Sequence, residues 1–240
     1  MRSAELFAGL GGLAYGTSEA GFKHTLVLEI DQNACNTIAL NAAKGTRHYR
    51  HWPVLGADVR SIDFKKMGRD LDLLSGGPPC QPFSMGGQHK GPTDERNMWP
   101  EAIRALKELR PKAFLFENVR GLLRPAFGDY LEFLELCLAY PSRYDPQRAW
   151  KAQLKTMRGF RAKGLNPSYR VIVQAVNAAD YGAAQKRHRA IIWGIRSDIA
   201  SSVEPLKPTH SRNALIWSQR VDGDYWVRHK IPAGLRSELT

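Results

Sequence analysis

The chain has few cysteines, and it has no long apolar run. Its three cysteines among 240 residues are odd in number and far apart, so neither a disulfide framework nor a zinc cluster is expected. No stretch of about 18 or more apolar residues is present, which argues against a transmembrane helix. The N-terminal residues enter a strand-like segment directly and do not have the shape of a signal peptide. We therefore expect a cytoplasmic protein with no metal and no membrane partner.

Acidic residues are scarce relative to basic ones. The sequence contains 35 Lys and Arg against 23 Asp and Glu, which gives a formal net charge of +12. A charge of this size attracts polyanions, and nucleic acids are the most common of these. The alternative is a solvated basic surface that aids solubility. Hydrophobic residues make up 43%, which is enough for one substantial core, so we expect one main domain.

Strand-like and helix-like segments alternate along the chain. Helices are expected over about 12–20, over Gln32–Ala43 and over Met98–Arg110, where apolar residues recur at helical spacing. Asp31 can cap the second helix and Pro111 stops the third. The expected strands are Glu5–Ala8, Thr25–Ile30, Val54–Val59, Leu71–Ser75, Ala113–Glu117, Tyr169–Val176 and Ala190–Ile195. This alternation predicts an α/β fold whose mostly parallel sheet has helices on both faces.

Two stretches depart from this alternation. Residues 143–163 carry seven Lys and Arg side chains against one acid, Asp145. We interpret them as a helical insertion with a solvated basic face, and a phosphate-binding role is the alternative. Residues 208–211 resemble a linker, and the aromatic residues that follow have no obvious core of their own.

A glycine-rich turn follows the first predicted strand. Gly9-x-Gly11-x-x-Ala14 opens a helix, and Glu29 ends the next strand. Glycines permit a tight turn and close approach of a ligand, while the acid can accept hydrogen bonds from ribose hydroxyls. Asp58, at the end of the third strand, could bind an adenine amino group or cap the next turn. The pattern favours a cofactor containing adenosine, and on these residues alone NAD and a purely structural turn stay open.

Cys80 follows an apolar strand and the sequence Gly76-Gly77-Pro78-Pro79. In an open α/β sheet, ligands bind at the carboxyl ends of the strands. Prolines hold the approach rigid, and a thiolate is a strong nucleophile near neutral pH. Cys35 and Cys137, by contrast, are expected inside helices or strands. We therefore interpret Cys80 as a nucleophile rather than as an inert cysteine in a turn.

Two further segments carry polar groups at strand ends. Glu117 ends the Phe114–Phe116 strand at the same predicted edge of the sheet, where a carboxyl group could donate a proton to a ring nitrogen or hydrogen-bond it. Arg187 and Arg189 are separated by one residue, so in extended backbone they point the same way. Two guanidinium groups there could hold a carbonyl oxygen and a phosphate, although taken alone the segment is only a basic loop.

Taken together, these motifs resemble the DNA cytosine-5 methyltransferase family, over about residues 3–211. The match to the nucleophile motif, Gly76 to Ser84, is almost letter for letter, and Glu117-Asn118-Val119 and Gln185-x-Arg187-x-Arg189 follow in the family's order. The resemblance implies a Rossmann-like methyltransferase fold and the cofactor S-adenosylmethionine, converted to S-adenosylhomocysteine, without a metal. It implies cofactor binding by Phe7, Ala8, Gly9, Leu10, Gly11, Gly12, Glu29, Ile30, Asp58, Val59, Pro79 and Trp99. It implies DNA contacts by Gln81, Ser84 and Arg96.

The resemblance also implies a mechanism on double-stranded DNA. The target cytosine is flipped out of the duplex, Cys80 adds to carbon 6, and Glu117 hydrogen-bonds or protonates nitrogen 3. Carbon 5 then accepts the methyl group, while Arg187 and Arg189 steady the cytosine carbonyl and the backbone near Cys80. The glycine-containing loop 84–91 could close over DNA. A nucleoid-associated bacterial or phage protein of a restriction–modification system is the implied setting.

The sequence departs from the family's pattern after the arginine motif. We expect residues 1–211 to form the catalytic and cofactor-binding domain, with the basic insertion near 128–165, and residues 212–240 to begin a truncated or split target recognition region. A second chain carrying that region is one expectation. The alternatives are a shortened product, a tRNA cytosine-5 methyltransferase of the same fold, and a module that binds cofactor without catalysis. Apolar surface left exposed around the cofactor domain would invite a partner chain.

Overall fold

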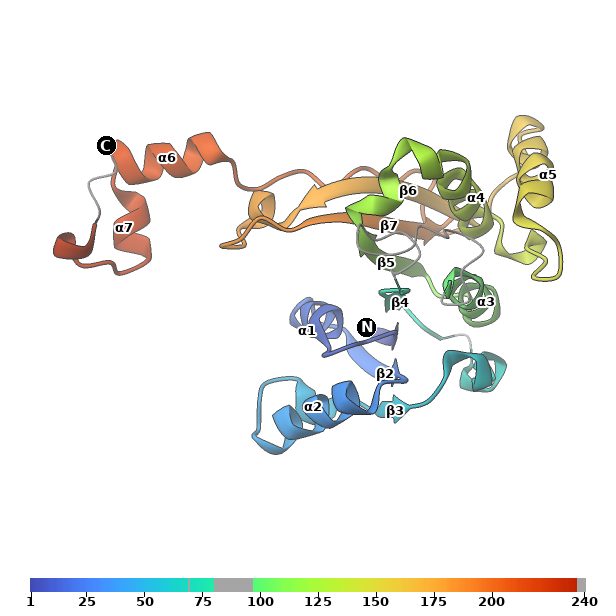
Figure 1. Ribbon diagram of the computed structural model, residues 1–240, viewed down its shortest axis with the longest axis horizontal. Coiled ribbons are helices and arrows are strands. Elements are labelled where there is room, and N and C mark those ends of the chain that lie inside the picture. Colours follow the sequence, from blue (N-terminus) through green and yellow to red (C-terminus); the bar gives the residue numbers. More distant parts are fainter. Residues whose placement is uncertain (69, 80–96, 237–240) are drawn as a thin grey trace. The chain divides into compact units, whose positions relative to one another are not determined.

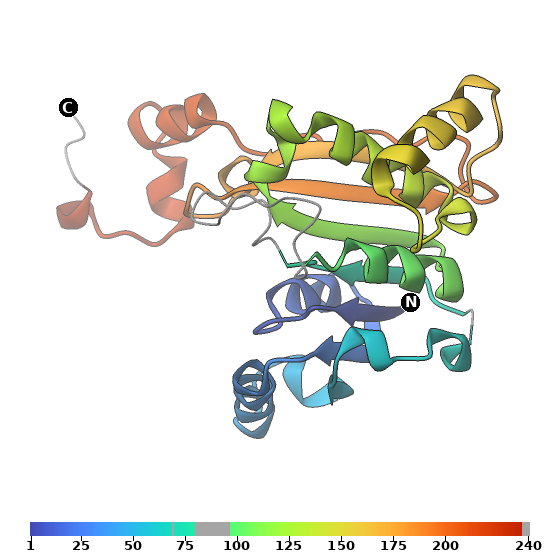
Figure 2. The same ribbon diagram turned by 45° about the vertical axis from the view of Figure 1, so that its right-hand side comes forward.

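A seven-stranded sheet organises the chain, as the computed structural model in Figure 1 shows. The structure describes residues 1–68, 70–79 and 97–236. The strands are β1 Arg2–Leu6, β2 Lys23–Glu29, β3 Val54–Gly56, β4 Leu73–Gly76, β5 Ala113–Val119, β6 Tyr169–Asn177 and β7 His188–Arg196. Their spatial order is β3-β2-β1-β4-β5-β7-β6, and the pairs from β3 to β5 are parallel. Figure 2 shows β7 pointing opposite to β5. The predicted α/β fold with a mostly parallel sheet is thus confirmed.

The described part of the chain contains seven α-helices, and the first three match the helices expected from the sequence. They are α1 Gly12–Glu19, α2 Gln32–Ala43, α3 Trp99–Leu109, α4 Gly128–Ala139, α5 Trp150–Ala162, α6 Arg212–Arg220 and α7 Asp224–Arg228. The predicted cap of α2 is confirmed, because the Asp31 carboxylate accepts a hydrogen bond from the Ala34 N–H at 2.8 Å. Helix α3 ends where Arg110 adopts a left-handed conformation, φ 48°, directly before Pro111.

The main core lies between the sheet and helices α3 and α4. Every residue of β4 is buried, as expected for a central parallel strand covered on both faces. Helix α3 turns the apolar residues that recur in its sequence toward this core, among them Ile103, Leu106 and Leu109. Ring contacts between Phe114, Phe116 and Tyr169 extend the same cluster across the sheet. The helical spacing seen in the sequence therefore marks the buried face of α3.

One carboxylate is buried inside the sheet. Glu5 lies opposite Ser75 in the parallel register of β1 and β4, is 1% exposed, and accepts a hydrogen bond from the Ser75 hydroxyl. Burial raises the pKa of Glu5 from 4.5 to about 8, and the Ser75 hydrogen bond only partly opposes the shift. Strand β1 leads into the glycine turn, and β4 leads into Pro78-Pro79. The hydrogen bond between Glu5 and Ser75 therefore links the two strands that end at the candidate site.

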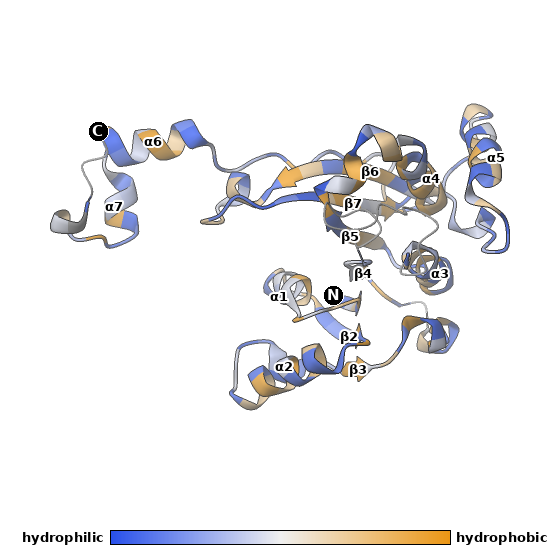
Figure 3. Ribbon diagram, in the orientation of Figure 1, coloured by the Kyte–Doolittle hydropathy of each residue, from blue (hydrophilic) through white to orange (hydrophobic). Residues whose placement is uncertain are grey.

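The stretch 128–165 folds as two helices, α4 and α5. Helix α4 buries Leu134, Leu136 and Cys137 in the main cluster. Arg158 of α5 bonds Glu132 and Asp129 of α4, both at 2.6 Å, and Arg161 also pairs with Glu132. Figure 3 shows α5 carrying both hydrophobic and hydrophilic residues. The acids of α4 thus neutralise part of the predicted basic face, which leaves less positive charge for a phosphate.

The chain divides into two compact units. The first comprises Met1–Ala175 with Ala190–Pro205, and the second comprises Val176–Arg189 with Leu206–Thr240. Within the second unit, α6 and α7 pack against each other, but Trp217 remains 60% exposed. Among the described residues, no helix is long and apolar enough to cross a membrane. Cys35 and Cys137, the two cysteines of the described part, are buried and unpaired.

Candidate active site

A pocket of about 530 Å³ lies at the carboxyl ends of β1, β2 and β4. This is the edge of an open α/β sheet at which ligands bind, and the volume falls in the range of about 300–1,000 Å³ that is usual for small-molecule sites. The pocket is lined by Phe7, Gly9, Leu28, Glu29, Ile30, Ala57, Asp58, Val59, Arg60, Gly77, Pro79 and Met98. It therefore brings together seven of the residues predicted to bind a cofactor: Phe7, Gly9, Glu29, Ile30, Asp58, Val59 and Pro79.

Backbone N–H groups hold the Glu29 carboxylate in place. One carboxylate oxygen accepts a hydrogen bond from Gly9 at 2.7 Å, and the other accepts from Ile30 at 2.9 Å and Asp31 at 2.8 Å. An ionised carboxylate has about four acceptor positions, so it retains capacity for a ribose hydroxyl. Since Gly9 belongs to the glycine turn and adopts φ +54°, Glu29 also fixes the loop that must approach the ligand.

The glycine turn divides into residues that face the pocket and residues that support it. Phe7 and Gly9 line the pocket. Ala8 is buried in a second apolar cluster with Trp52, and a Cβ at Gly11 would lie 2.5 Å from the Trp52 ring. The remaining predicted turn residues lie elsewhere: Leu10 is 61% exposed and Gly12 begins α1. Close packing of the turn on the aromatic ring, as much as ligand approach, accounts for the glycine at position 11.

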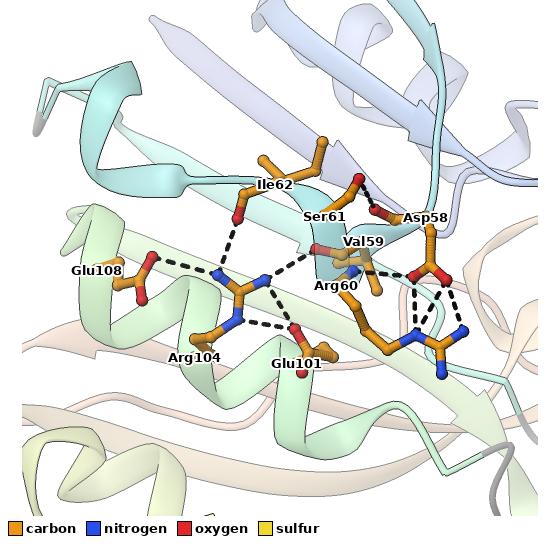
Figure 4. Close-up of polar contacts among 8 residues, drawn as sticks. All are labelled: Asp58, Val59, Arg60, Ser61, Ile62, Glu101, Arg104 and Glu108. Atoms are coloured by element: carbon orange, nitrogen blue, oxygen red, sulfur yellow. Dashed lines mark hydrogen bonds and ion pairs between the residues drawn. The ribbon is translucent and has the colours of Figure 1, made fainter.

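Asp58 is held by Arg60 in this structure (Figure 4). Its carboxylate accepts hydrogen bonds from the Arg60 backbone N–H at 2.9 Å and from Arg60 Nε at 3.0 Å, and these bonds lower the pKa of Asp58. The Arg60 side chain is 62% exposed, so it can move aside or share the carboxylate with a ligand. Asp58 thus caps the turn η2 Val59–Ser61, as one of the two interpretations of the sequence had it, and it also borders the pocket.

The end of β5 meets the segment that leads to Cys80. A Cβ built at Gly77 would lie 3.8 Å from Glu117 Oε2, so the carboxyl group lies beside the pocket lining. Asn118 is 1% exposed and donates from its amide to the Pro78 carbonyl at 3.0 Å. Asn118 therefore ties β5 to the prolines before the predicted nucleophile. The need of a buried amide for hydrogen-bond partners explains this contact, of which the sequence showed only the position of Asn118 next to Glu117.

Several predicted site residues lie outside the described part of the chain. They are Cys80, Gln81, Ser84 and Arg96, together with the loop 84–91. Pro79, which precedes Cys80 directly, lines the pocket.

Trp99 lies in the core, not among the residues that line the pocket. It is 0% exposed, and its ring meets Phe116 edge to face with centroids 5.8 Å apart. Its neighbour Met98 lines the pocket instead. The reason is helical geometry: α3 begins at Trp99 and turns this side chain toward the sheet.

Arg187 and Arg189 belong to the second unit. The Arg187 N–H donates to the Asn177 side chain at 3.1 Å, and the Arg187 carbonyl accepts from Ala178 at 3.0 Å, so the turn between β6 and β7 is closed at its base. The N–H of His210, from the predicted linker, donates to the Asp180 carbonyl at 2.9 Å. The linker residues therefore brace the turn that carries both arginines.

This arrangement suits a nucleoside-containing ligand next to an acid–base group. The carboxylates of Glu29, at the end of β2, and of Asp58, just after β3, border the pocket. The carboxyl group of Glu117 lies next to Gly77, which also lines the pocket. Two residues that line the pocket, Arg60 and Met98, were not expected from the sequence. Arg60 had a local signal, since it follows Asp58 by two residues. Met98 lines the pocket only because of the way α3 packs against the sheet.

Comparison with known proteins gives one consistent result. A family model for C-5 cytosine-specific DNA methylases matches residues 1–220. Type II methyltransferase M.NgoMIV of Neisseria gonorrhoeae is 36% identical over 197 residues, which cover 82% of this chain and 52% of that protein. Type II methyltransferase M.AquIA of Picosynechococcus is 32% identical over 213 residues, covering 85% and 75%. A structure described as a DNA modification methyltransferase from an Escherichia coli prophage has a TM-score of 0.56 and 26% identity, and covers 90% of this chain and 54% of that one. The chain spans about three quarters of M.AquIA, but about half or less of the length of several other curated relatives that it matches.

Proposed function

The chain belongs to the C-5 cytosine-specific DNA methylase family, and from this membership we propose that it methylates carbon 5 of cytosine in double-stranded DNA, with S-adenosylmethionine as methyl donor. One observation supports this most directly. The pocket that holds Glu29 and Asp58 is also lined by Gly77 and Pro79, and Gly77 adjoins Glu117. The candidate cofactor site and the candidate acid–base group therefore meet where the strand leading to Cys80 ends.

The residues of the pocket fit S-adenosylmethionine. Glu29 retains an acceptor position for the ribose hydroxyls, and Asp58 can accept from the adenine amino group. The Val59 N–H lies at the start of η2, where helical N–H groups lack partners within the helix, so it is available to an adenine ring nitrogen. Exposed Ile30 offers an apolar side chain for the ring to cover. When bound, the cofactor supplies a methyl group attached to a positively charged sulfur.

The chain's own residues would act on the base in a fixed order. The Cys80 thiolate forms a bond to carbon 6 of the flipped cytosine, while Glu117 protonates or hydrogen-bonds nitrogen 3 and so accommodates the displaced electron pair. Carbon 5 thereby becomes nucleophilic and accepts the methyl group. A base then removes the carbon-5 proton, and the electron pair left behind expels Cys80. Arg187 and Arg189 would hold the cytosine carbonyl oxygen and the backbone near Cys80.

Sequence selection is proposed to involve residues 212–240 together with a target recognition region. The exposed aromatic and apolar side chains of α6 and α7, including Trp217, support contact with DNA, with that region or with a second chain. The net charge of +12 supports attraction to the DNA backbone. By analogy with its Type II relatives, we place the chain in the bacterial cytoplasm, associated with the nucleoid in a restriction–modification system.

Methyl transfer from labelled S-adenosylmethionine tests the proposal. The chain alone is incubated with mixed genomic DNA or with tRNA, and the product nucleosides are separated by mass spectrometry. Incorporation at carbon 5 of deoxycytidine supports the proposed activity. Label confined to tRNA would overturn the DNA assignment in favour of the tRNA alternative. Cofactor binding without transfer to either substrate would overturn activity of the chain alone and favour a catalytic part that requires a companion chain.

A further inference from the structure

Arg104 of α3 donates hydrogen bonds to the turn that carries the adenine-facing groups (Figure 4). One terminal nitrogen donates to the Val59 carbonyl at 2.8 Å, and the other donates to the Ile62 carbonyl at 2.9 Å. Val59 is the first residue of the turn η2 and follows Asp58 directly, and Ile62 is the residue after the turn. A residue more than 40 positions away in sequence thus fixes both ends of the turn.

The guanidinium group of Arg104 is itself held on several sides. Glu101 accepts a hydrogen bond from its Nε at 2.8 Å and forms an ion pair with a terminal nitrogen at 2.7 Å, and Glu108 accepts from the other terminal nitrogen at 3.3 Å. The guanidinium carbon lies 4.8 Å from the centroid of the buried Phe64 ring. Four hydrogen bonds, from Nε and from both terminal nitrogens, therefore hold the guanidinium group, and the side chain is 28% exposed.

This set of contacts requires arginine rather than any cation. The planar guanidinium group presents donors in a rigid fork, whereas a lysine ammonium is a single point charge on a flexible stem. A lysine at this position could bond one of these carbonyl groups or one carboxylate, but it could not bond the Val59 and Ile62 carbonyls together. Glu101 and Glu108 contribute by orienting the fork from the same helix at the i−3 and i+4 positions.

We propose that Arg104 is a positioning residue for adenine recognition, acting through Asp58 and the Val59 N–H. The proposal rests on the proposed cofactor. The Asp58 carboxylate and the Val59 N–H form a complementary pair for adenine, because the amino group of that base donates and its neighbouring ring nitrogen accepts. Hypoxanthine reverses this pattern, since it carries a carbonyl and an N–H at those positions. A turn fixed at both ends keeps the pair aligned and so discriminates between the two bases.

Calorimetric binding of S-adenosylhomocysteine and of its inosine counterpart tests the proposal without turnover. The proteins are the wild-type chain, Arg104→Met, Arg104→Lys and Asp58→Ala. The control is Arg158→Met, which removes an arginine that also bonds two carboxylates but lies on α5, whose residues do not line the pocket. Thermal unfolding of each protein is recorded in parallel. Arg104→Lys provides the measurement if the methionine variant does not fold.

The wild-type chain is expected to prefer the adenine compound, and both Arg104 variants are expected to reduce that preference about tenfold, equivalent to about 1.4 kcal/mol. In the double variant that combines Arg104→Met with Asp58→Ala, the preference should fall by less than the product of the two single effects, because part of the effect of Arg104 passes through Asp58. A preference that survives in the Arg104 variants, or an equal loss of affinity for both compounds, would overturn the positioning role. Failure of the wild-type chain to bind either compound would overturn the proposed cofactor instead.

Discussion

Glu5→Gln tests how the buried carboxylate contributes to stability. Glu5 of β1 is 1% exposed, lies opposite Ser75 of β4, and accepts a hydrogen bond from the Ser75 hydroxyl. Burial penalises the charged form, which raises the pKa of Glu5 to about 8. Glutamine has nearly the same shape, is neutral at every pH, and can still bond the Ser75 hydroxyl. The variant therefore removes the ionisation while preserving the packing and the strand pairing.

The pH range of the effect follows from the direction of the shift. A raised pKa means that the folded state binds the proton more tightly than the unfolded state, so the stabilisation is complete below about pH 4.5. It is lost as the pH rises toward 8. One pKa unit corresponds to about 1.4 kcal/mol, so the shift from 4.5 to about 8 represents on the order of 5 kcal/mol of unfolding free energy. The wild-type chain should lose this amount across the range, and Glu5→Gln should not.

Urea unfolding followed by tryptophan fluorescence, at pH 5.5 and pH 8.5, measures the difference. The difference in unfolding free energy between the two proteins at each pH excludes the contributions of the titrating groups that both proteins share. Glu19→Gln is the control, because its exposed carboxyl has a pKa lowered mainly by a hydrogen bond with His48 and should give no gain at alkaline pH. If the stability difference between wild type and Glu5→Gln is the same at both pH values, the buried-carboxylate reasoning is wrong.

Three further predictions concern the proposed reaction. Cys80→Ser should abolish methyl transfer and leave cofactor affinity nearly unchanged; equal turnover in radiolabel assays would refute the mechanism. Glu29→Ala should weaken cofactor binding by about 1–2 kcal/mol, the scale of a lost charge-assisted hydrogen bond, and calorimetry showing unchanged affinity would contradict the assignment. Affinity for DNA should fall steeply between about 50 and 200 mM salt, because a basic surface binds by counterion release. If fluorescence anisotropy titrations show that DNA affinity does not change with salt concentration, the net charge of +12 does not serve DNA binding.

Local sequence signals determined the elements and much of the site. Alternating strand and helix patterns predicted the sheet, and Asp31 and Pro111 marked helix boundaries because caps and prolines act on neighbouring backbone groups. The placement of Glu29 and Asp58 beside one pocket also followed from sequence, since the carboxyl ends of parallel strands meet at one edge. The family resemblance rested on the same short segments, and the family match confirmed it.

Tertiary structure decided which side chains from distant parts of the sequence contact these site segments. Whether Trp99 or Met98 reaches the pocket depends on how α3 rotates against the sheet. The pairing of Arg158 with the acids of α4 depends on how two helices pack. Arg104 is the clearest case, because its carbonyl partners at Val59 and Ile62 lie far away along the chain. A sequence pattern reports the period and caps of its own element, but contacts across such separations exist only after the core has fixed the elements against each other.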